Sequence, residues 1–332
     1  MDLSWRESHG DGMAALRSWF FTATTAQRCQ PALLSNASMH HLYTHPHQGA
    51  FGNGLAKLFN SRRFATYRRA AMSRLPFMTL DSDVVDVVYM NWLVDEALAA
   101  PFAPPGARLW SHQGRTPLTV LTYRHGHFGP RWMGPLRRLM PSPLQSNWRL
   151  YLAEPLSDAP PIPTVAFVYN MMDSLAYVAG TRLFSDALPS HWPARFDFRV
   201  TPDEAIIGIA PGDGSAPRLA ARATRAARAG EAVLPPPWSG MFNGWPDAIV
   251  RLASQDAAVV EVPTAEGAPA RSALATIALP VDAASVEPLL LDTQTLDCPL
   301  LQRLDADPEA LCFLLPSVRF SALSERLLRA SA

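Results

Sequence analysis

Hydrophobic and polar positions alternate in two neighbouring segments near the middle of the chain, which predicts two β-strands. In residues 147–152 the polar face carries Asn147, Arg149 and Tyr151, opposite Trp148, Leu150 and Leu152. In residues 165–172 we expect Val165, Phe167, Tyr169 and Met171 to oppose Ala166, Val168, Asn170 and Met172. Because an asparagine, an arginine and a tyrosine are costly to bury without partners, we expect the polar face to line a cavity or to pair internally.

The same pattern predicts the other elements of the chain. The period becomes helical from Asp173, and Pro189 and Pro193 end that helix. Further helices are expected at residues 12–26, 55–75, 242–255 and 321–329, and residues 30–53 look irregular. Strands are expected from residue 83, over 118–129, over 195–201 and over 204–212, with two or three more before the last helix. Residues 217–230 fit either a helix or a strand.

Composition indicates a globular protein in a reducing compartment. The chain has 332 residues, of which 48% are hydrophobic, and no uncharged apolar run is long enough to span a bilayer. The apolar stretch near the N-terminus is interrupted by Arg17 and makes a poor secretory signal. Cys29, Cys298 and Cys312 form no CxxC motif, which argues against a disulfide scaffold. We therefore expect a cytoplasmic protein.

Charge divides the chain into two regions. Residues 12–80 contain no Asp or Glu but carry eight Lys and Arg residues, and since the whole chain is neutral, the remainder carries −8. Such a split fits nucleic-acid or membrane contact, or a basic arm docked on an acidic domain. Aromatic and apolar residues are interleaved with the arginines, which favours docking. The sequence thus predicts a helical N-terminal extension (residues 1–80) packed on a second domain (residues 81–332).

Four segments carry a resemblance to a known family. They read VVYMNWLVDEALAAPFAPPGARL, SNWRLYL, TVAFVYNMMDSLAYVAGTRLF and ALPSHWPARFDF. Their order resembles domain of unknown function 2071, a branch of the acetoacetate-decarboxylase-like superfamily, over residues 84–315. The resemblance implies an α+β, mainly β fold: an antiparallel β-barrel with flanking helices. It also implies a strand within residues 217–230.

One residue type separates this chain from the best-known chemistry of that superfamily. Acetoacetate decarboxylase forms an imine through a lysine placed just after the helix. This chain has Leu188, Pro189, Ser190 and His191 at the comparable point, and Lys57 is its only lysine. Schiff-base catalysis from the usual position is therefore excluded, and hydrogen-bond donors or a metal must stabilise any developing negative charge.

Arg149 is the strongest candidate for a functional residue. A guanidinium binds carboxylate in a bidentate fork, so Arg149 suits an anionic substrate, although an ion pair with Asp173, Glu154 or Asp86 is the structural alternative. The predicted catalytic residues are Arg149 as anion anchor, His191 as proton carrier and Tyr151. The predicted substrate-binding residues are Asn91, His125, His127, Asn147, Tyr169, Asn170 and Ser190. His125 and His127 fit a functional pair at the barrel mouth, for acid/base work or a metal, and a surface hairpin end equally.

No cofactor is predicted. His40, His41, His45 and His47 could offer a metal three or four donors, but a histidine-rich loop that caps the barrel is the favoured interpretation.

The sequence favours a small-molecule enzyme of specialised metabolism. We expect a lyase-type reaction (decarboxylation, dehydration, aldol addition or cyclisation) on a carbonyl or carboxylate compound, without a Schiff-base lysine. The alternative is a non-catalytic barrel that binds one small ligand. A nucleic-acid or membrane partner of the basic arm is less favoured, and a homodimer is left open.

Overall fold

The computed structural model describes residues 40–226, 234–264 and 270–329, and these are mainly β with flanking helices, as predicted. The strands are β1 (Leu80–Asp95), β2 (Arg115–Arg124), β3 (Gly129–Pro130), β4 (Leu144–Tyr151), β5 (Thr164–Met172), β6 (Arg195–Val200), β7 (Glu204–Ala210), β8 (Leu219–Arg225), β9 (Ala257–Val262), β10 (Arg271–Ala278), β11 (Glu287–Leu291) and β12 (Leu311–Leu327). The helices are α2 (Ala50–Phe59), α3 (Arg62–Met72), α4 (Glu96–Ala99), α5 (Leu175–Phe184), α6 (Pro236–Ser239), α7 (Trp245–Ala253) and α8 (Pro299–Arg303), with 3-10 turns η1 (Ala100–Phe102), η2 (Arg131–Leu139) and η4 (Ala283–Ser285). The helix expected at residues 12–26 lies outside the described residues.

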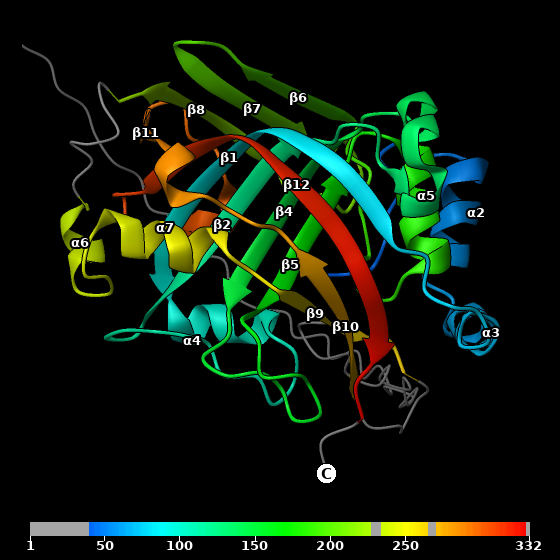
Figure 1. Ribbon diagram of the computed structural model, residues 1–332. Coiled ribbons are helices and arrows are strands. Elements are labelled where there is room, and N and C mark those ends of the chain that lie inside the picture. Colours follow the sequence, from blue (N-terminus) through cyan, green and yellow to red (C-terminus); the bar gives the residue numbers. More distant parts are fainter. Residues whose placement is uncertain (1–39, 227–233, 265–269, 330–332) are drawn as a thin grey trace, which may run out of the picture. The chain divides into compact units, whose positions relative to one another are not determined.

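Seven of the described strands close into a barrel in the order β1, β2, β4, β5, β9, β10, β12 (Figure 1). The barrel closes because β12 pairs with both β10 and β1. Neighbouring strands are antiparallel except β5 and β9, which are parallel, so the expectation of a wholly antiparallel barrel is wrong at this pair. The chain passes through α5 and a second sheet between β5 and β9, and parallel pairing requires such a long connection.

The middle of β12 shows which side of each strand faces into the barrel. There Ser317 and Arg319 are exposed, whereas Val318 between them is buried. Since the outside of a closed barrel is its exposed side, Val318 points inward. It belongs to one apolar cluster with Tyr89 and Phe167, so these side chains also face the interior.

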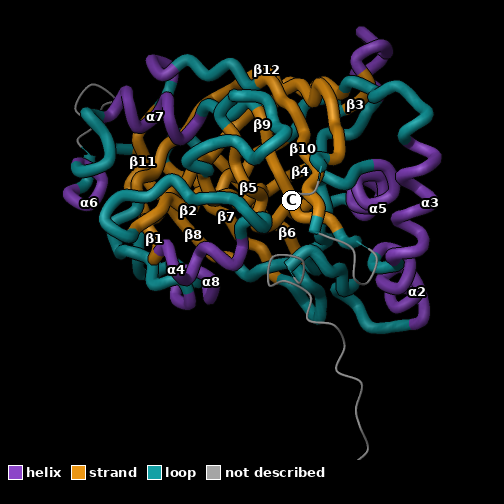
Figure 2. Tube along the Cα trace, turned by 90° about the horizontal axis from the view of Figure 1, so that it is seen from below, coloured by secondary structure: helices purple, strands orange, loops and turns teal. Residues whose placement is uncertain are grey.

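A second sheet and two groups of helices surround the barrel. Strands β6, β7, β8 and β11 continue from the N-terminal half of β12 and cover the outer faces of several barrel strands (Figure 1). Helices α6 and α7 lie at one end of the barrel strands, and α2, α3 and α5 lie at the other (Figures 1 and 2). The buried face of α7 packs into the interior cluster, so this helix closes its end of the barrel. It matches the helix predicted at residues 242–255.

The helix predicted at residues 321–329 is wrong, because residues 321–327 are the end of β12. Ala322 and Leu327 pair with Ile277 and Ala273 of β10. The segment contains good helix formers, but its backbone hydrogen bonds close the barrel, and this tertiary pairing overrides local propensity. The strand implied for residues 217–230 is confirmed as β8, in which buried and exposed residues alternate.

The helix predicted at residues 55–75 is instead two helices, separated at Asn60 and Ser61. Ser61 Oγ accepts a hydrogen bond from the Phe64 backbone N–H (3.2 Å) and so caps α3. Helix α2 begins earlier than predicted and includes Gly52, where an added Cβ would lie 2.7 Å from the His47 carbonyl oxygen. Only glycine allows this close approach.

Helix α3 is attached to the rest of the described chain through ion pairs. Arg68 and Arg69 both pair with Asp186, which follows α5, and Arg69 Nε lies 2.9 Å from the Asp186 carboxylate. Arg69 also donates to the Pro263 carbonyl oxygen (2.9 Å). No residue of α3 is fully buried, so these pairs supply much of its attachment.

None of the described helices combines the length and the apolar character needed to cross a membrane.

Candidate functional site

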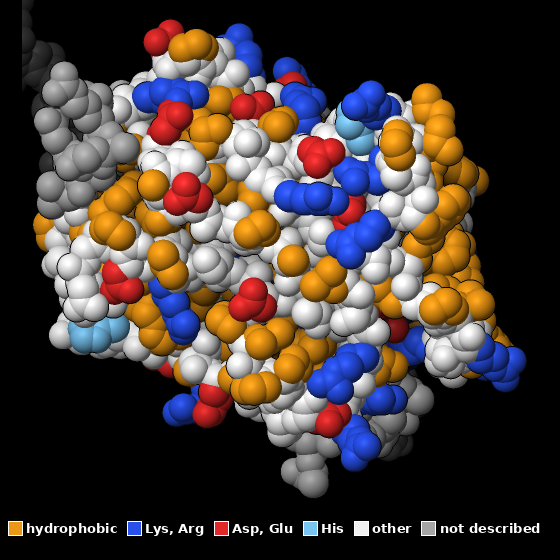
Figure 3. All heavy atoms as spheres, viewed as in Figure 1, with side chains coloured by type: hydrophobic (Ala, Val, Ile, Leu, Met, Phe, Trp, Pro, Cys, Tyr) orange, Lys and Arg blue, Asp and Glu red, His pale blue; other side chains and the backbone are white. Residues whose placement is uncertain are grey.

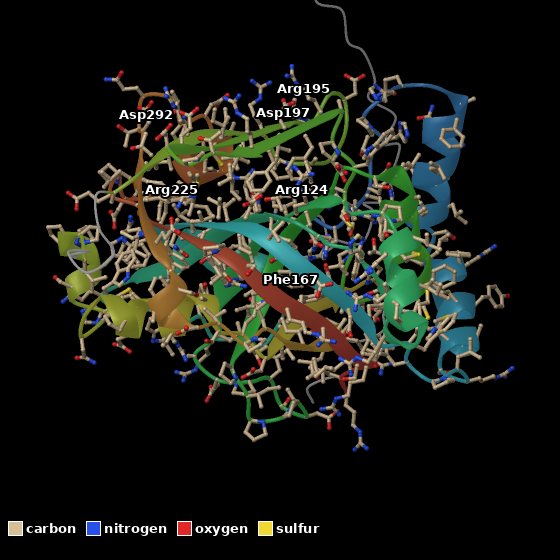
Figure 4. All side chains as sticks on the ribbon, turned by 45° about the horizontal axis from the view of Figure 1, so that its top comes forward. Arg124, Phe167, Arg195, Asp197, Arg225 and Asp292 are labelled. Atoms are coloured by element: carbon tan, nitrogen blue, oxygen red, sulfur yellow. The ribbon has the colours of Figure 1, made fainter. Side chains whose placement is uncertain are left out.

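Strands β4 and β5 place the predicted polar residues on the inner wall of the barrel, with one change of pattern. The pairing of these strands shifts between Trp148 and Arg149, so that Trp148 faces Tyr169 and Arg149 faces Phe167. Val168 is therefore the extra residue of a β-bulge, which reverses the alternation along β5. Phe167 points into the barrel (Figure 4), whereas Tyr169 packs with the cluster on the outer side.

The strand register arranges the inner wall in rows. One row runs across β12, β1, β2, β4 and β5 and contains Phe313, Tyr89, Leu121, Asn147 and Asn170. The next row towards α7 contains Leu311, Asn91, Thr119, Arg149 and Phe167. Neighbouring strands are about 5 Å apart, so Tyr89 and Asn147 have backbones about 10 Å apart across the wall. Six polar residues (Tyr89, Asn91, Thr119, Asn147, Arg149 and Asn170) thus converge on one part of the interior.

Arg149 is completely buried and holds the end of α7. Its Nη2 donates to the Leu252 carbonyl oxygen (2.6 Å), one of the last carbonyls of the helix, and its Nε lies 3.4 Å from the Tyr151 hydroxyl. The guanidinium also lies over the Tyr89 and Tyr151 rings, at 5.4 and 5.6 Å from their centroids. A cation is favourable at a helix C-terminus and over an aromatic face. No carboxylate pairs with Arg149 within the described ranges.

The structural role of Arg149 is therefore to bind the C-terminal end of α7, and not to form the ion pair that was the alternative to ligand binding. Of the three carboxylates considered as partners, Glu154 pairs with Arg108, and the Asp173 carboxylate accepts from the Leu144 backbone N–H. No described ion pair joins Asp86 to Arg149. The guanidinium thus has no carboxylate counter-charge among the described residues, although burial is opposed by Tyr151 and Tyr89, which raise the pKa of Arg149.

A short polar network surrounds Arg149. Thr119 Oγ1 donates to Asn91 Oδ1 (2.6 Å) and lies 2.8 Å from the Tyr151 hydroxyl. Asn91 Nδ2 donates to the Leu311 carbonyl oxygen (2.6 Å), and the Tyr151 hydroxyl donates to the Leu252 carbonyl oxygen (2.6 Å). Asn91 and Tyr151 therefore lie on the inner wall beside Arg149. Their polar groups already have hydrogen-bond partners within the protein.

A second chain of hydrogen bonds crosses the neighbouring part of the interior. The Ser190 hydroxyl donates to the Leu188 carbonyl oxygen (3.3 Å) and accepts from Asn170 Nδ2 (2.6 Å). This contact places Asn170 Oδ1 on the opposite side, where it accepts from Gln145 Nε2 (2.5 Å). Gln145 Oε1 in turn faces His125 Nε2 (2.6 Å). Each bond sets the orientation of the next amide, so the donors and acceptors of the chain are determined.

His125 completes this chain as a neutral residue. Its Nε2 carries the proton donated to Gln145, and its Nδ1 accepts from the Ser82 hydroxyl (2.8 Å). Burial lowers the pKa of His125 to about 4. The histidine is therefore uncharged at neutral pH, and both ring nitrogens have partners. His127, its predicted companion, lies in a turn with φ of 53° and does not share this environment.

Three buried polar atoms of the inner wall have no hydrogen-bond partner in the described structure. They are Arg149 Nη1, Asn147 Oδ1 and the Tyr89 hydroxyl oxygen. Burial raises the pKa of Tyr89 to about 12, although the neighbouring Arg149 guanidinium lowers it, so the hydroxyl stays protonated at neutral pH and its oxygen interacts with Arg149. Buried polar groups are normally paired, and an unpaired one costs about 1–3 kcal/mol. Tyr89 was not predicted, because only the register with β2 brings it into the row of Asn147.

His191 lies away from this group, on the other side of β5. Its Nδ1 is 2.7 Å from Ser215 Oγ, and its ring contacts Tyr169, which packs on the outer side of the barrel. Burial, and then the Arg182 guanidinium, lower its pKa well below the usual range. The structure therefore does not bring His191 to Arg149, and the neutral ring is a poor proton carrier near pH 7. Tyr169 likewise contacts His40 (3.1 Å) outside the barrel.

The other predicted histidines form no metal centre in the described structure. His40 stacks on Phe102, His41 is buried with a pKa lowered by burial to about 3, and His45 packs against His47. No group of three or more His, Cys, Asp or Glu side chains among residues 40–226, 234–264 and 270–329 is placed to hold a metal ion.

A surface groove of about 780 Å³ lies elsewhere, along β6, β7 and β8. Arg195 and Asp197, labelled in Figure 4, line it and pair with each other at 2.5 Å. Arg222 pairs with Glu204 at 2.6 Å. The charges of the groove are therefore neutralised within the protein. The unpaired polar atoms of the interior are not, and a ligand could pair with them. The interior around Arg149 is the better candidate site.

Comparison with solved structures supports the fold. The chain is similar to an enduracididine biosynthesis enzyme, MppR, complexed with pyruvate (14% identity, TM-score 0.52, covering 78% of this chain and 93% of that one). It is also similar to acetoacetate decarboxylase from Legionella pneumophila (11% identity, TM-score 0.50, covering 75% and 87%). At these identities the likeness shows a shared fold alone, that of acetoacetate-decarboxylase-like proteins.

The narrower family of the sequence resemblance is not shown. No protein-family model matches the chain, and no curated protein matches its sequence.

Proposed function

We propose that this protein is a lyase-type enzyme that acts on a small carbonyl or carboxylate compound inside the barrel. The observation that carries the proposal is Arg149, which is completely buried, has no carboxylate partner among the described residues and keeps Nη1 free. Taking a charge out of water without a partner costs several kcal/mol. An anionic ligand would supply the missing counter-charge. The fold shared with acetoacetate-decarboxylase-like proteins is consistent with this role.

The free donors suit a developing enolate. Lyase-type reactions next to a carbonyl place negative charge on its oxygen, and one well-placed donor contributes about 3–4 kcal/mol. Arg149 Nη1 and the Tyr89 hydroxyl face the same part of the interior and can both donate. Tyr151 holds the arginine and the end of α7 in place, because its hydroxyl accepts from Arg149 Nε and donates to the Leu252 carbonyl oxygen.

Decarboxylation is the member of this class that the interior supports best. Loss of carbon dioxide breaks a carbon–carbon bond and leaves its electron pair as an enolate, without a base to remove a proton from carbon. The other reactions of the class require such a base, and His125, the histidine of this wall, has a pKa of about 4. The enolate carbon then takes a proton from water or from a tyrosine hydroxyl.

The proposal uses no Schiff-base lysine. Lys57 is the only lysine of the chain, and it lies exposed on α2. An electron sink made of hydrogen-bond donors replaces the imine.

A non-catalytic ligand-binding barrel is the second candidate function. The absence of a group that titrates near neutral pH around Arg149, among the described residues, favours it. The two candidates agree on an anionic occupant and differ only in turnover.

Release of carbon dioxide from acetoacetate and oxaloacetate separates the two candidates. We expect the protein to accelerate at least one reaction over buffer, and Arg149→Met to reduce the rate about 100-fold, as for loss of one essential donor. Arg251→Met is the matched control, because Arg251 lies next to Leu252 on α7 but stacks on Trp110 at 4.6 Å. Binding of these acids without any acceleration would contradict the enzyme and support the binding protein.

We propose a cytoplasmic protein without a nucleic-acid or membrane partner. The face shown in Figure 3 supports the absence of such a partner, because Lys and Arg side chains are scattered there with Asp and Glu between them.

A further inference from the structure

The unpaired acceptor of Asn147 lies on the same wall as the unpaired donors of Arg149 and Tyr89. We propose that the molecule bound in the interior carries a hydroxyl group close to its anionic or carbonyl group, and that Asn147 Oδ1 accepts the hydrogen bond of this hydroxyl. The inference rests on the proposed function, since it specifies the chemistry of the occupant of the same site. It makes Asn147 a residue that determines specificity.

The orientation of Asn147 follows from the hydrogen-bond chain beside it. Asn170 Oδ1 is an acceptor, because Asn170 Nδ2 is already bonded to Ser190 Oγ. The side of Asn147 that faces it, at 3.4 Å, is therefore the Nδ2 amide. The Asn147 oxygen consequently points away from this chain and remains free, with 3% of the residue exposed. A buried acceptor of this kind takes a donor from the molecule that occupies the interior beside it.

The strand spacing guides the choice of ligands for a test. Asn147 and Arg149 are two residues apart on one strand face, which separates their backbones by about 7 Å. Four-carbon acids with a hydroxyl at C2, C3 or C4 vary the distance between carboxylate and hydroxyl within this range.

The donor is a hydroxyl and not an ammonium. The two inner rows that contain Asn147 and Arg149 include no Asp or Glu, so a buried ammonium would find no counter-charge there. It would also lie close to the Arg149 guanidinium and be repelled by it. A neutral hydroxyl satisfies the amide oxygen without either cost.

Calorimetric titration with butanoate and its 2-, 3- and 4-hydroxy derivatives tests the inference. We expect at least one hydroxy acid to bind about tenfold more tightly than butanoate, because a site built to bond a hydroxyl discriminates against the analogue that lacks it. In Asn147→Leu this preference should fall below about threefold, while butanoate keeps its affinity.

Two results would overturn the inference and leave the proposed function intact: equal, Arg149-dependent binding of all four acids by the wild type, or a hydroxyl preference that survives in Asn147→Leu. If none of the acids binds, both the inference and the proposed function are wrong. If Asn147→Leu does not fold, Asn147→Ala is titrated in its place, whereas equal binding of all four acids by the wild type overturns the inference without any variant.

Discussion

Replacement of Arg149 by methionine tests whether this buried charge serves stability or a ligand. The change removes one charge-assisted hydrogen bond to Leu252 O, about 1.5–3 kcal/mol, and two cation–π contacts with Tyr89 and Tyr151, each about 0.5–2 kcal/mol. It also removes the desolvation cost of an uncompensated guanidinium, which is several kcal/mol. Leu252 O keeps a partner, since the Tyr151 hydroxyl donates to it at 2.6 Å.

These terms largely cancel, so we expect the free energy of unfolding of Arg149→Met to lie within about 2 kcal/mol of the wild type. Urea unfolding of the ligand-free proteins, with equal slopes, measures the difference. Arg251→Met is the control and should lose about 0.5–1 kcal/mol, the value of one exposed cation–π contact. A loss of about 3–5 kcal/mol in Arg149→Met would refute the reasoning, because it is the signature of a broken buried ion pair.

Three further predictions follow from other parts of the structure. His125 has its pKa lowered to about 4 from 6.5, so its neutral form stabilises the fold above pH 6.5 and this contribution is lost as the pH falls towards 4. The loss amounts to about 2 kcal/mol of unfolding free energy between pH 7 and 5. His125→Gln does not titrate, so in a pH series of urea unfolding its stability should fall by about 2 kcal/mol less over this range. An equal fall in the variant and the wild type would contradict this. Asp186→Asn removes the shared partner of Arg68 and Arg69, so trypsin should cleave within α3 about fivefold faster, whereas an unchanged rate would show that other contacts hold the helix. Borohydride should trap no imine with acetoacetate, because the exposed Lys57 is the only lysine, and an adduct on Lys57 would mean that the N-terminal region builds the site.

The local pattern predicted the inner wall of β4 but not that of β5. Strict alternation along β4 correctly placed Asn147, Arg149 and Tyr151 on one face. Along β5 the bulge at Val168 reversed the alternation, so that Asn170, and not Tyr169, joined Asn147 inside the barrel. A bulge depends on how two strands pair, so it cannot be recognised from the sequence of either strand alone.

Positions that depend on long-range pairing were also missed. Tyr89 joins the site because its strand lies two places from β4 in the barrel, a relation that the sequence of β1 does not contain. Ser190 and His191 are neighbours in the chain, yet Ser190 bonds to Asn170 of the inner wall while His191 contacts Tyr169 on the other side. In an extended segment, successive side chains point in opposite directions.

The barrel interior is proposed to bind a small carboxylate through Arg149. Calorimetric titration of the wild type and Arg149→Met with butanoate and with 3-hydroxybutanoate, each beside its uncharged amide, tests it most directly. We predict that the wild type binds the acids and not the amides. Loss of one charge-assisted interaction of about 1.5–3 kcal/mol should weaken acid binding by Arg149→Met about 10- to 100-fold. Equal affinity of the two proteins for the acids, or equal binding of acid and amide by the wild type, would contradict the claim.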